Sequence, residues 1–193
     1  MPDAPDYHNY VIRRYTSPLV PSEWGLGIFS GHTRCYTVLD FNDGTTTGVY
    51  GSDPENPPVL LMGGDHPSVL FRGLEDSNQL VERMLEKDFL VSCSDGGKYF
   101  VVEGQKYYWK PRCDKGGHVR YMLVTPSRRA DILADLQVNI QSYQNSNDPM
   151  RLSVLNPDTY EMQSSRLFYA ILASIVIMCK KRDPWIASAG LCI

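Results

Sequence analysis

The residues best placed to do chemistry in this 193-residue chain are cations around the turn Cys113-Asp-Lys-Gly-Gly117. Five potential cations lie within 11 positions: Lys110, Arg112, Lys115, His118 and Arg120. Guanidinium and ammonium groups beside the N–H groups of a turn suit a phosphate or a carboxylate. Trp109 precedes the cluster and offers an amphipathic ring. We predict that these six residues bind an anionic ligand, and a solvated hairpin without a ligand is the alternative.

Asp65 and His66 form a second candidate group, suited to acid–base catalysis. They follow Gly63-Gly64, which lets the backbone turn tightly, and a carboxylate can orient an imidazole that acts as a general base. Because adjacent side chains on a strand point apart, the pair requires a turn, and a polar loop before Pro67 is the simpler interpretation. The sequence contains no Gly-x-Ser-x-Gly motif and no Cys–His signature of nucleophilic catalysis.

The sequence predicts neither a metal site nor a cofactor. His32-Thr-Arg-Cys35 and Asp65-His66 lack the paired ligands of a zinc site. Gly25-Leu-Gly27-Ile-Phe-Ser-Gly31 has the wrong spacing for a dinucleotide fingerprint and is interpreted as a flexible loop after Trp24. We therefore expect a protein that works without either group.

Composition bounds the class of protein. Hydrophobic residues make up 42% of the chain and charged residues 21%, which is typical of a globular domain. A net charge of −3 argues against general nucleic-acid binding, although it allows a local basic patch. We expect a cytoplasmic protein, because no secretory signal is visible and the five cysteines are odd in number without a Cys-x-x-Cys pair.

Most of the chain is predicted to form about eleven short strands, which indicates a barrel or a sandwich. The clearest hairpin joins 34–41 to 46–50 through Asn42-Asp43-Gly44, a turn that favours left-handed backbone geometry. The other candidates are 10–15, 59–62, 68–71, 89–93, 98–102, 106–110, 118–124, 136–140 and 150–154. Four prolines in residues 1–30 predict a loosely packed N-terminal arm, followed by a single domain over 31–193.

Two segments have helical patterns. Asp76 to Lys87 places Leu80, Val81, Met84 and Leu85 on one face and is predicted to be a surface helix. The second helix, over about 158–182, starts at the cap residue Asp158 and contains no charge from Leu167 to Cys179. A helix that is apolar on every side must be surrounded by protein or lipid. The run covers roughly 20 Å, short of the roughly 30 Å of a bilayer core, so we predict a buried core helix without a transmembrane span.

Two stretches carry a resemblance to a known family. Lys106-Tyr-Tyr-Trp-Lys110 and Leu152-Ser-Val-Leu-Asn-Pro-Asp158 before the apolar helix resemble a fungal domain-of-unknown-function family of the tubby C-terminal-like superfamily. That superfamily includes the phospholipid scramblases and the LURP-one-related proteins. The resemblance covers about 34–182 and implies a mostly β fold, a closed antiparallel barrel of about twelve strands around a hydrophobic C-terminal helix. In relatives of this fold, basic surfaces bind phosphoinositide head groups.

Two functions remain open from the sequence. The first is a binding module that recognises a lipid head group, another anion or a small apolar ligand through the basic hairpin, with peripheral membrane contact. The second is a cofactor-independent isomerase, cyclase or lyase, which would use a barrel pocket lined by some of the 12 tyrosines with a His or Asp as acid–base group. A filled barrel with a flat basic face would favour the first, and a deep pocket would favour the second.

Overall fold

The computed structural model describes residues 6–15, 25–40, 46–52, 56–63, 68–72, 80–113, 119–125, 132–138, 150–155 and 166–180. Within these ranges the protein is a single antiparallel sheet of thirteen strands with two helices. The first seven strands are β1 (Tyr7–Arg14), β2 (Gly25–Ser30), β3 (Thr33–Asp40), β4 (Thr46–Tyr50), β5 (Leu60–Gly63), β6 (Ser68–Arg72) and β7 (Leu80–Leu85). The other six are β8 (Val91–Ser92), β9 (Lys98–Val102), β10 (Gln105–Cys113), β11 (Val119–Val124), β12 (Ile132–Val138) and β13 (Met150–Leu155). The helices are α1 (Glu86–Phe89) and α2 (Arg166–Lys180).

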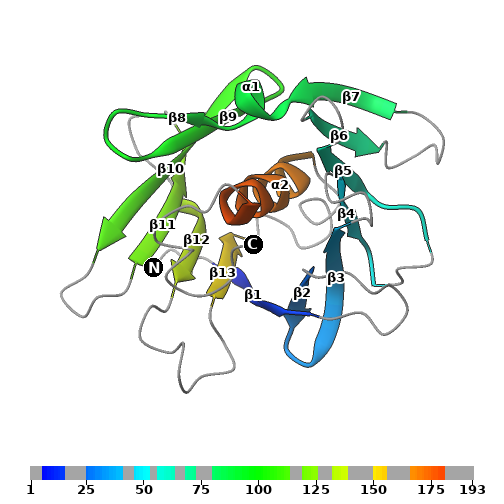
Figure 1. Cartoon of the computed structure of the whole chain (residues 1–193). Helices are drawn as coiled ribbons and strands as arrows, with labels where there is room; N and C mark the ends of the chain where they lie inside the picture. The colour runs from blue at the N-terminus through cyan, green and yellow to red at the C-terminus, as the bar shows by residue number, and fades with distance from the viewer. Residues whose placement is uncertain are drawn as a thin grey trace.

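The strand order follows the chain, with one exception that joins its two ends. From edge to edge the order is β7-β6-β5-β4-β3-β2-β1-β13-β12-β11-β10-β9-β8. Each strand therefore pairs with its neighbours in sequence, except that β7 and β8 are the two edges and that β1 pairs with β13, with Tyr10 opposite Leu152. The sheet curves around α2, which lies in the middle of the molecule (Figure 1).

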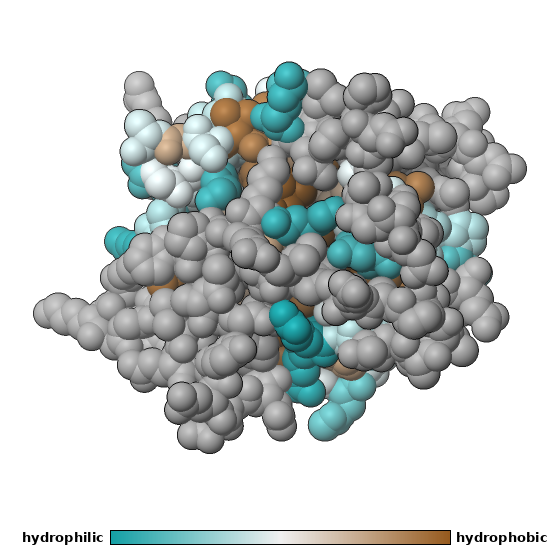
Figure 2. All heavy atoms as spheres, in the orientation of Figure 1, coloured by the Kyte–Doolittle hydropathy of each residue, from teal (hydrophilic) through white to brown (hydrophobic). Residues whose placement is uncertain are grey.

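Alternation of side chains gives the sheet an apolar inner face. On β11, Val119, Tyr121 and Leu123 are buried, whereas Arg120 between them is exposed. The same period of two runs through β12 and β13, and the buried residues join one hydrophobic core with α2. In the space-filling view, the hydrophobic residues that are visible are set back between hydrophilic ones (Figure 2).

Helix α2 fills the space that the sheet encloses. Every residue from Phe168 to Cys179 is buried, which confirms the prediction of a core helix. The predicted start at Asp158 lies outside the described residues. None of the helices in the described part of the chain is long and apolar enough to cross a membrane.

Polar contacts fix α2 at two points. The Trp109 indole Nε1 of β10 donates to the Ser174 hydroxyl at 2.8 Å, and that hydroxyl donates to the carbonyl oxygen of Ile171 at 2.7 Å. At the C-terminal end, Lys180 Nζ donates to the Thr47 hydroxyl of β4 at 2.7 Å. Because hydrogen bonds are directional, these contacts fix the position of α2 along its axis more tightly than apolar packing alone would.

Among the described residues the sheet is not closed by hydrogen bonds, in contrast to the closed barrel expected from the resemblance. Its edge strands are β7 and β8, and the short helix α1 connects them. Phe89 of α1 stacks on Phe100 of β9 with ring centroids 5.7 Å apart, and Phe100 stacks in turn on Tyr107 at 5.6 Å. Apolar packing by α1 therefore covers the seam where strand pairing stops.

Eleven of the strands correspond to predicted ones, and the 34–41/46–50 hairpin is confirmed as β3 and β4, with Asp40 opposite Thr47. The two strands that were missed lie in misinterpreted segments. The helix predicted over Asp76–Lys87 is wrong, because Leu80–Leu85 forms β7 and pairs with β6, and α1 takes up only the end of that range. Leu80, Val81, Met84 and Leu85 follow a helical spacing, and pairing with β6 overrides it.

Two described segments within the first thirty residues, Tyr7–Arg14 and Gly25–Ser30, are strands of the sheet. β1 lies between β13 and β2, in the middle of the sheet order. The segment interpreted as a flexible glycine loop forms β2 and the turn at Gly31, and its glycines serve close packing. A Cβ on Gly25 would lie 2.6 Å from the carbonyl oxygen of Tyr15, and one on Gly27 would lie 2.6 Å from the ring of Phe29.

Candidate functional site

The predicted cations that the structure describes lie together on the outer face of the sheet. Trp109 points into the core, so the alternation of β10 turns Lys110 and Arg112 outward, where both are exposed. Arg112 stands directly opposite Arg120 of β11. Like charges in directly opposed positions repel, so this pair raises the local positive potential.

The register extends this group across two more strands. Arg120 stands opposite Gln137 of β12, and Gln137 stands opposite Arg151 of β13, which is exposed. We call five residues of this face the outer basic row: Lys110, Arg112, Arg120, Gln137 and Arg151. Four of its five members are cations, contributed by three strands.

One acid accompanies the row. Asp135 of β12 forms an ion pair with Arg120, whose Nε donates to Oδ1 at 3.2 Å while Nη2 donates to Oδ2. Gln137 Nε2 lies 3.4 Å from the same carboxylate. Among the outward-facing residues that the structure describes on β10–β13, Asp135 is the only acid, and its side chain is 10% exposed. The pair therefore fixes the Arg120 guanidinium in place but leaves the surface positive.

Trp109 does not belong to this surface. Its ring is completely buried and bonded to Ser174, so the structure places it in the core and not beside the cations. Two other aromatic residues are turned outward beside the row. Tyr99 and Tyr108 lie with ring centroids 5.6 Å apart, and Lys106 Nζ lies 4.9 Å above the Tyr99 ring. These rings supply the amphipathic surface that was expected from Trp109.

Several predicted site residues cannot be placed. Lys115, His118, Asp65 and His66 all lie outside the described residues. Of the earlier metal candidates, His32 is exposed and the Cys35 thiol lies 3.6 Å from the carbonyl oxygen of Thr33. Within the described ranges no three His, Cys, Asp or Glu side chains converge on a common point.

A group of aromatic side chains surrounds the N-terminal part of α2. Phe168 lies 5.7 Å from the Tyr10 ring and 5.6 Å from the Tyr36 ring, and Tyr36 hydrogen-bonds to Tyr169. Burial raises the pKa of Tyr36 above its ordinary value, and neighbouring Tyr169 adds to the effect. Burial also raises the pKa of Tyr169, which the hydrogen bond from Tyr36 partly offsets. Both phenols therefore stay protonated at neutral pH and are poor proton acceptors.

His8 is the described histidine nearest to this group along the sheet. It lies two residues before Tyr10 on β1 and so faces the same side, and its buried Nε2 has no hydrogen-bond partner in the part of the chain that is described. The arrangement is suited to packing more than to acid–base chemistry.

No protein-family model, curated protein or solved structure matches the chain. The arguments about its function therefore depend on the side chains described above. Of these, the outer basic row is the most strongly charged group that the sequence analysis and the structure have in common.

Proposed function

We propose that the protein is a binding module for anionic lipid surfaces, which it contacts peripherally through the outer basic row. The observation that carries this proposal is the placement of Arg112 directly opposite Arg120, with Lys110 beside them. Lys110 and Arg112 have no ion-pair partner among the described residues. A negatively charged surface would relieve the repulsion between the two arginines and accept hydrogen bonds from Lys110 and Arg112.

The size of the row fits a surface of several head groups. Neighbouring strands are about 4.8 Å apart, so the three steps from Arg112 to Arg151 span roughly 14 Å. Each cation near an anionic membrane contributes about 1 kcal/mol at low salt. Four cations would give a roughly thousandfold preference for the membrane, reduced by the existing pairing of Arg120 and by salt.

The tubby C-terminal-like class is part of the same proposal, with α1 rather than strand pairing covering the seam between β7 and β8. It is supported by an antiparallel order in which β1 lies beside β13, with a buried C-terminal helix inside. It is further supported by α1, which connects β7 to β8 and packs against β9. We infer a peripheral, cytoplasmic role from this combination of fold and surface.

The alternative, a cofactor-independent enzyme, has less support. Side chains of α2 occupy the interior that such an enzyme would need as a pocket. The inward tyrosines Tyr36 and Tyr169 have raised pKa values and bond to each other. These features favour a structural role for the tyrosine group.

Vesicle co-sedimentation tests the proposal. Wild-type protein should sediment with vesicles of phosphatidylcholine and phosphatidylserine at low salt, less at high salt, and not with phosphatidylcholine alone. The variant Lys110→Ala/Arg112→Ala should lose roughly 2 kcal/mol of binding at low salt, a factor of about thirty.

A charge-matched control separates the row from total charge. Lys87→Ala/Arg166→Ala removes two other exposed cations and should bind like the wild type. Circular dichroism checks that both variants are folded. Equal binding by the two double variants, or no wild-type binding at low salt, would refute the role of the row.

A further inference from the structure

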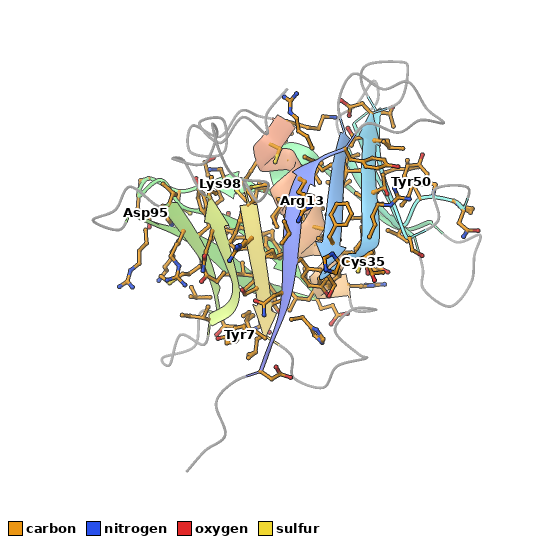
Figure 3. All side chains as sticks on the ribbon, turned by 90° about the horizontal axis from the view of Figure 1, so that it is seen from below. Tyr7, Arg13, Cys35, Tyr50, Asp95 and Lys98 are labelled. Atoms are coloured by element: carbon orange, nitrogen blue, oxygen red, sulfur yellow. The ribbon has the colours of Figure 1, made fainter. Side chains whose placement is uncertain are left out.

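A second basic group lies on the outer face of β1–β3, apart from the outer basic row. The guanidinium carbon of Arg34 lies 4.7 Å from the centroid of the Tyr15 ring, and that of Arg13 lies 5.4 Å from the Phe29 ring. Figure 3 views the molecule from below and labels Arg13 on β1. Stacking on a ring restricts each guanidinium and leaves its in-plane N–H donors directed sideways.

A bulge in β3 brings the polar residues of this group to the same face. Phe29 of β2 stands opposite Arg34, and Gly27 stands opposite Thr37, with the register shift between Ile28 and Phe29. Gly27 also stands opposite Arg13 of β1. Because Gly27 has no side chain, the Phe29 ring lies over it, and the arginines and Thr37 surround this point.

Two polar atoms in this group are buried without a partner. Arg34 Nε and Thr37 Oγ1 have no hydrogen bond within the described part of the structure, and Thr37 is completely buried. A buried donor left unsatisfied costs about 1–3 kcal/mol, so a ligand that accepts from both would recover that free energy. None of the outward-facing residues described on β1–β4 is acidic.

We propose that Arg34 and Thr37, with the charge of Arg13, form a binding site for the phosphate oxyanion of a phosphate monoester. Three acceptor oxygens and a charge near −2 match two guanidinium groups and a hydroxyl better than a carboxylate does. Arg13 has a further contact of its own, so in the proposed site it contributes only its positive charge. The hydrogen bonds to the phosphate come from Arg34 and Thr37. This proposal is independent of the proposed lipid function, because none of the three residues belongs to the outer basic row.

Occupation of the site requires a local rearrangement that can be measured. Both partnerless atoms are buried, so an oxygen that reaches them must displace the edge of the Tyr15 or Phe29 ring. Binding should therefore shift the Arg34 Nε–H resonance and the ring resonances of these two residues together. A solvent molecule that merely bridges the two atoms would give no saturable response to phosphate.

Titration with inorganic phosphate at constant ionic strength, followed by NMR, tests the site. We expect a saturable shift of the Arg34 Nε–H signal, no such shift with chloride, and about tenfold weaker binding in Thr37→Val. Arg34→Lys keeps the charge but removes Nε and should abolish saturable binding. Arg112→Gln, which removes a cation of the outer basic row, should leave the titration unchanged.

Two vesicle samples of equal surface charge separate the sources of the phosphate group. Preference for phosphatidic acid over phosphatidylglycerol, lost in Arg34→Lys, would assign the site to a lipid phosphate monoester, and equal binding of the two would assign it to a soluble one. The proposal is overturned if phosphate gives no saturable shift, or if folded Arg34→Lys and Thr37→Val titrate like the wild type. The phosphate titration is read at Arg34 itself, so its outcome does not bear on the outer basic row.

Discussion

The hydrogen bond between Trp109 and Ser174 offers a quantitative test of how α2 is held in the sheet. Both side chains are completely buried, and the Ser174 hydroxyl accepts from Trp109 Nε1 at 2.8 Å while it donates to the Ile171 carbonyl. Ser174→Ala removes the acceptor and leaves the indole N–H buried without a partner. Such an unsatisfied donor costs about 1–3 kcal/mol, so we expect the free energy of unfolding to fall by that amount.

The same substitution should cost much less when the indole is absent. In Trp109→Phe, the Ser174 hydroxyl keeps only its bond to the Ile171 carbonyl, a local bond that contributes little to helix stability. Ser174→Ala in that background should change the free energy of unfolding by less than about 0.5 kcal/mol. The difference between the two backgrounds is the coupling energy of the buried pair.

Urea denaturation monitored by circular dichroism measures all four proteins of this cycle. Trp109→Phe alone should destabilise the protein, since it exchanges an indole for a smaller ring in a packed core. The reasoning would be refuted if Ser174→Ala cost the same in both backgrounds. An unchanged slope of free energy against urea in all four proteins is the control for two-state unfolding.

Three further predictions follow from burial. Ile171→Asp should prevent cooperative folding, because an unpaired buried charge costs several kcal/mol. Ile171→Val should lower the free energy of unfolding by only about 1 kcal/mol. A soluble Asp variant that unfolds cooperatively would contradict the burial of the helix. Gly27→Ala should destabilise by about 1–3 kcal/mol in thermal or urea unfolding, because its Cβ would lie 2.6 Å from the Phe29 ring, and Phe29→Ala should relieve much of that cost. The raised pKa values of Tyr36 and Tyr169 mean that the folded state holds these protons more tightly, so their stabilisation is complete below the ordinary tyrosine pKa of about 10 and declines as pH rises above it. Urea denaturation should show a lower free energy of unfolding at pH 11 than at pH 9, and Tyr36→Phe should reduce this difference. An equal difference in the variant would mean that Tyr36 is not its source.

The core helix could be predicted because its signal is local. Thirteen consecutive residues from Leu167 to Cys179 carry no charge, and their length is too short for a bilayer. Only burial in the protein's own core satisfies both conditions. The structure confirms this for every residue from Phe168 to Cys179.

Strands β2 and β7 could not be predicted because tertiary contacts determine them. The glycines of β2 are required by the approach of Tyr15 and Phe29, which no local pattern reveals. The apolar spacing in β7 is that of a helix, and pairing with β6 imposes the strand against it. In both segments the deciding contacts are made by strand pairing and side-chain packing in three dimensions, which hydrophobic period alone does not encode.

The candidate site was predictable where strand alternation alone was enough. Lys110 and Arg112 are two residues apart on one strand, so their common face follows from the sequence. The same alternation turns Trp109 to the other face, and treating proximity in sequence as proximity in space led to its inclusion. Arg151 was missed because its position opposite Gln137 depends on the register between β12 and β13.

The pairing of β1 with β13 determines how the two proposed sites relate to each other. Arg151 stands opposite Val11, Val11 stands opposite Phe29, and Phe29 stands opposite Arg34, so the two cationic groups are joined by an apolar bridge. Three strand steps separate Arg151 from Arg34, roughly 14 Å, but Arg13 of β1 lies one strand step and two residues from Arg151, roughly 8 Å and comparable to the screening length at physiological salt. Arg112 of β10 is six strand steps from Arg34 of β3, so its removal should leave phosphate binding at Arg34 unchanged at 0.15 M salt. Coupling should emerge only near 0.01 M, where the screening length is about 30 Å, and strong coupling at physiological salt would mean that the two groups bind one extended ligand.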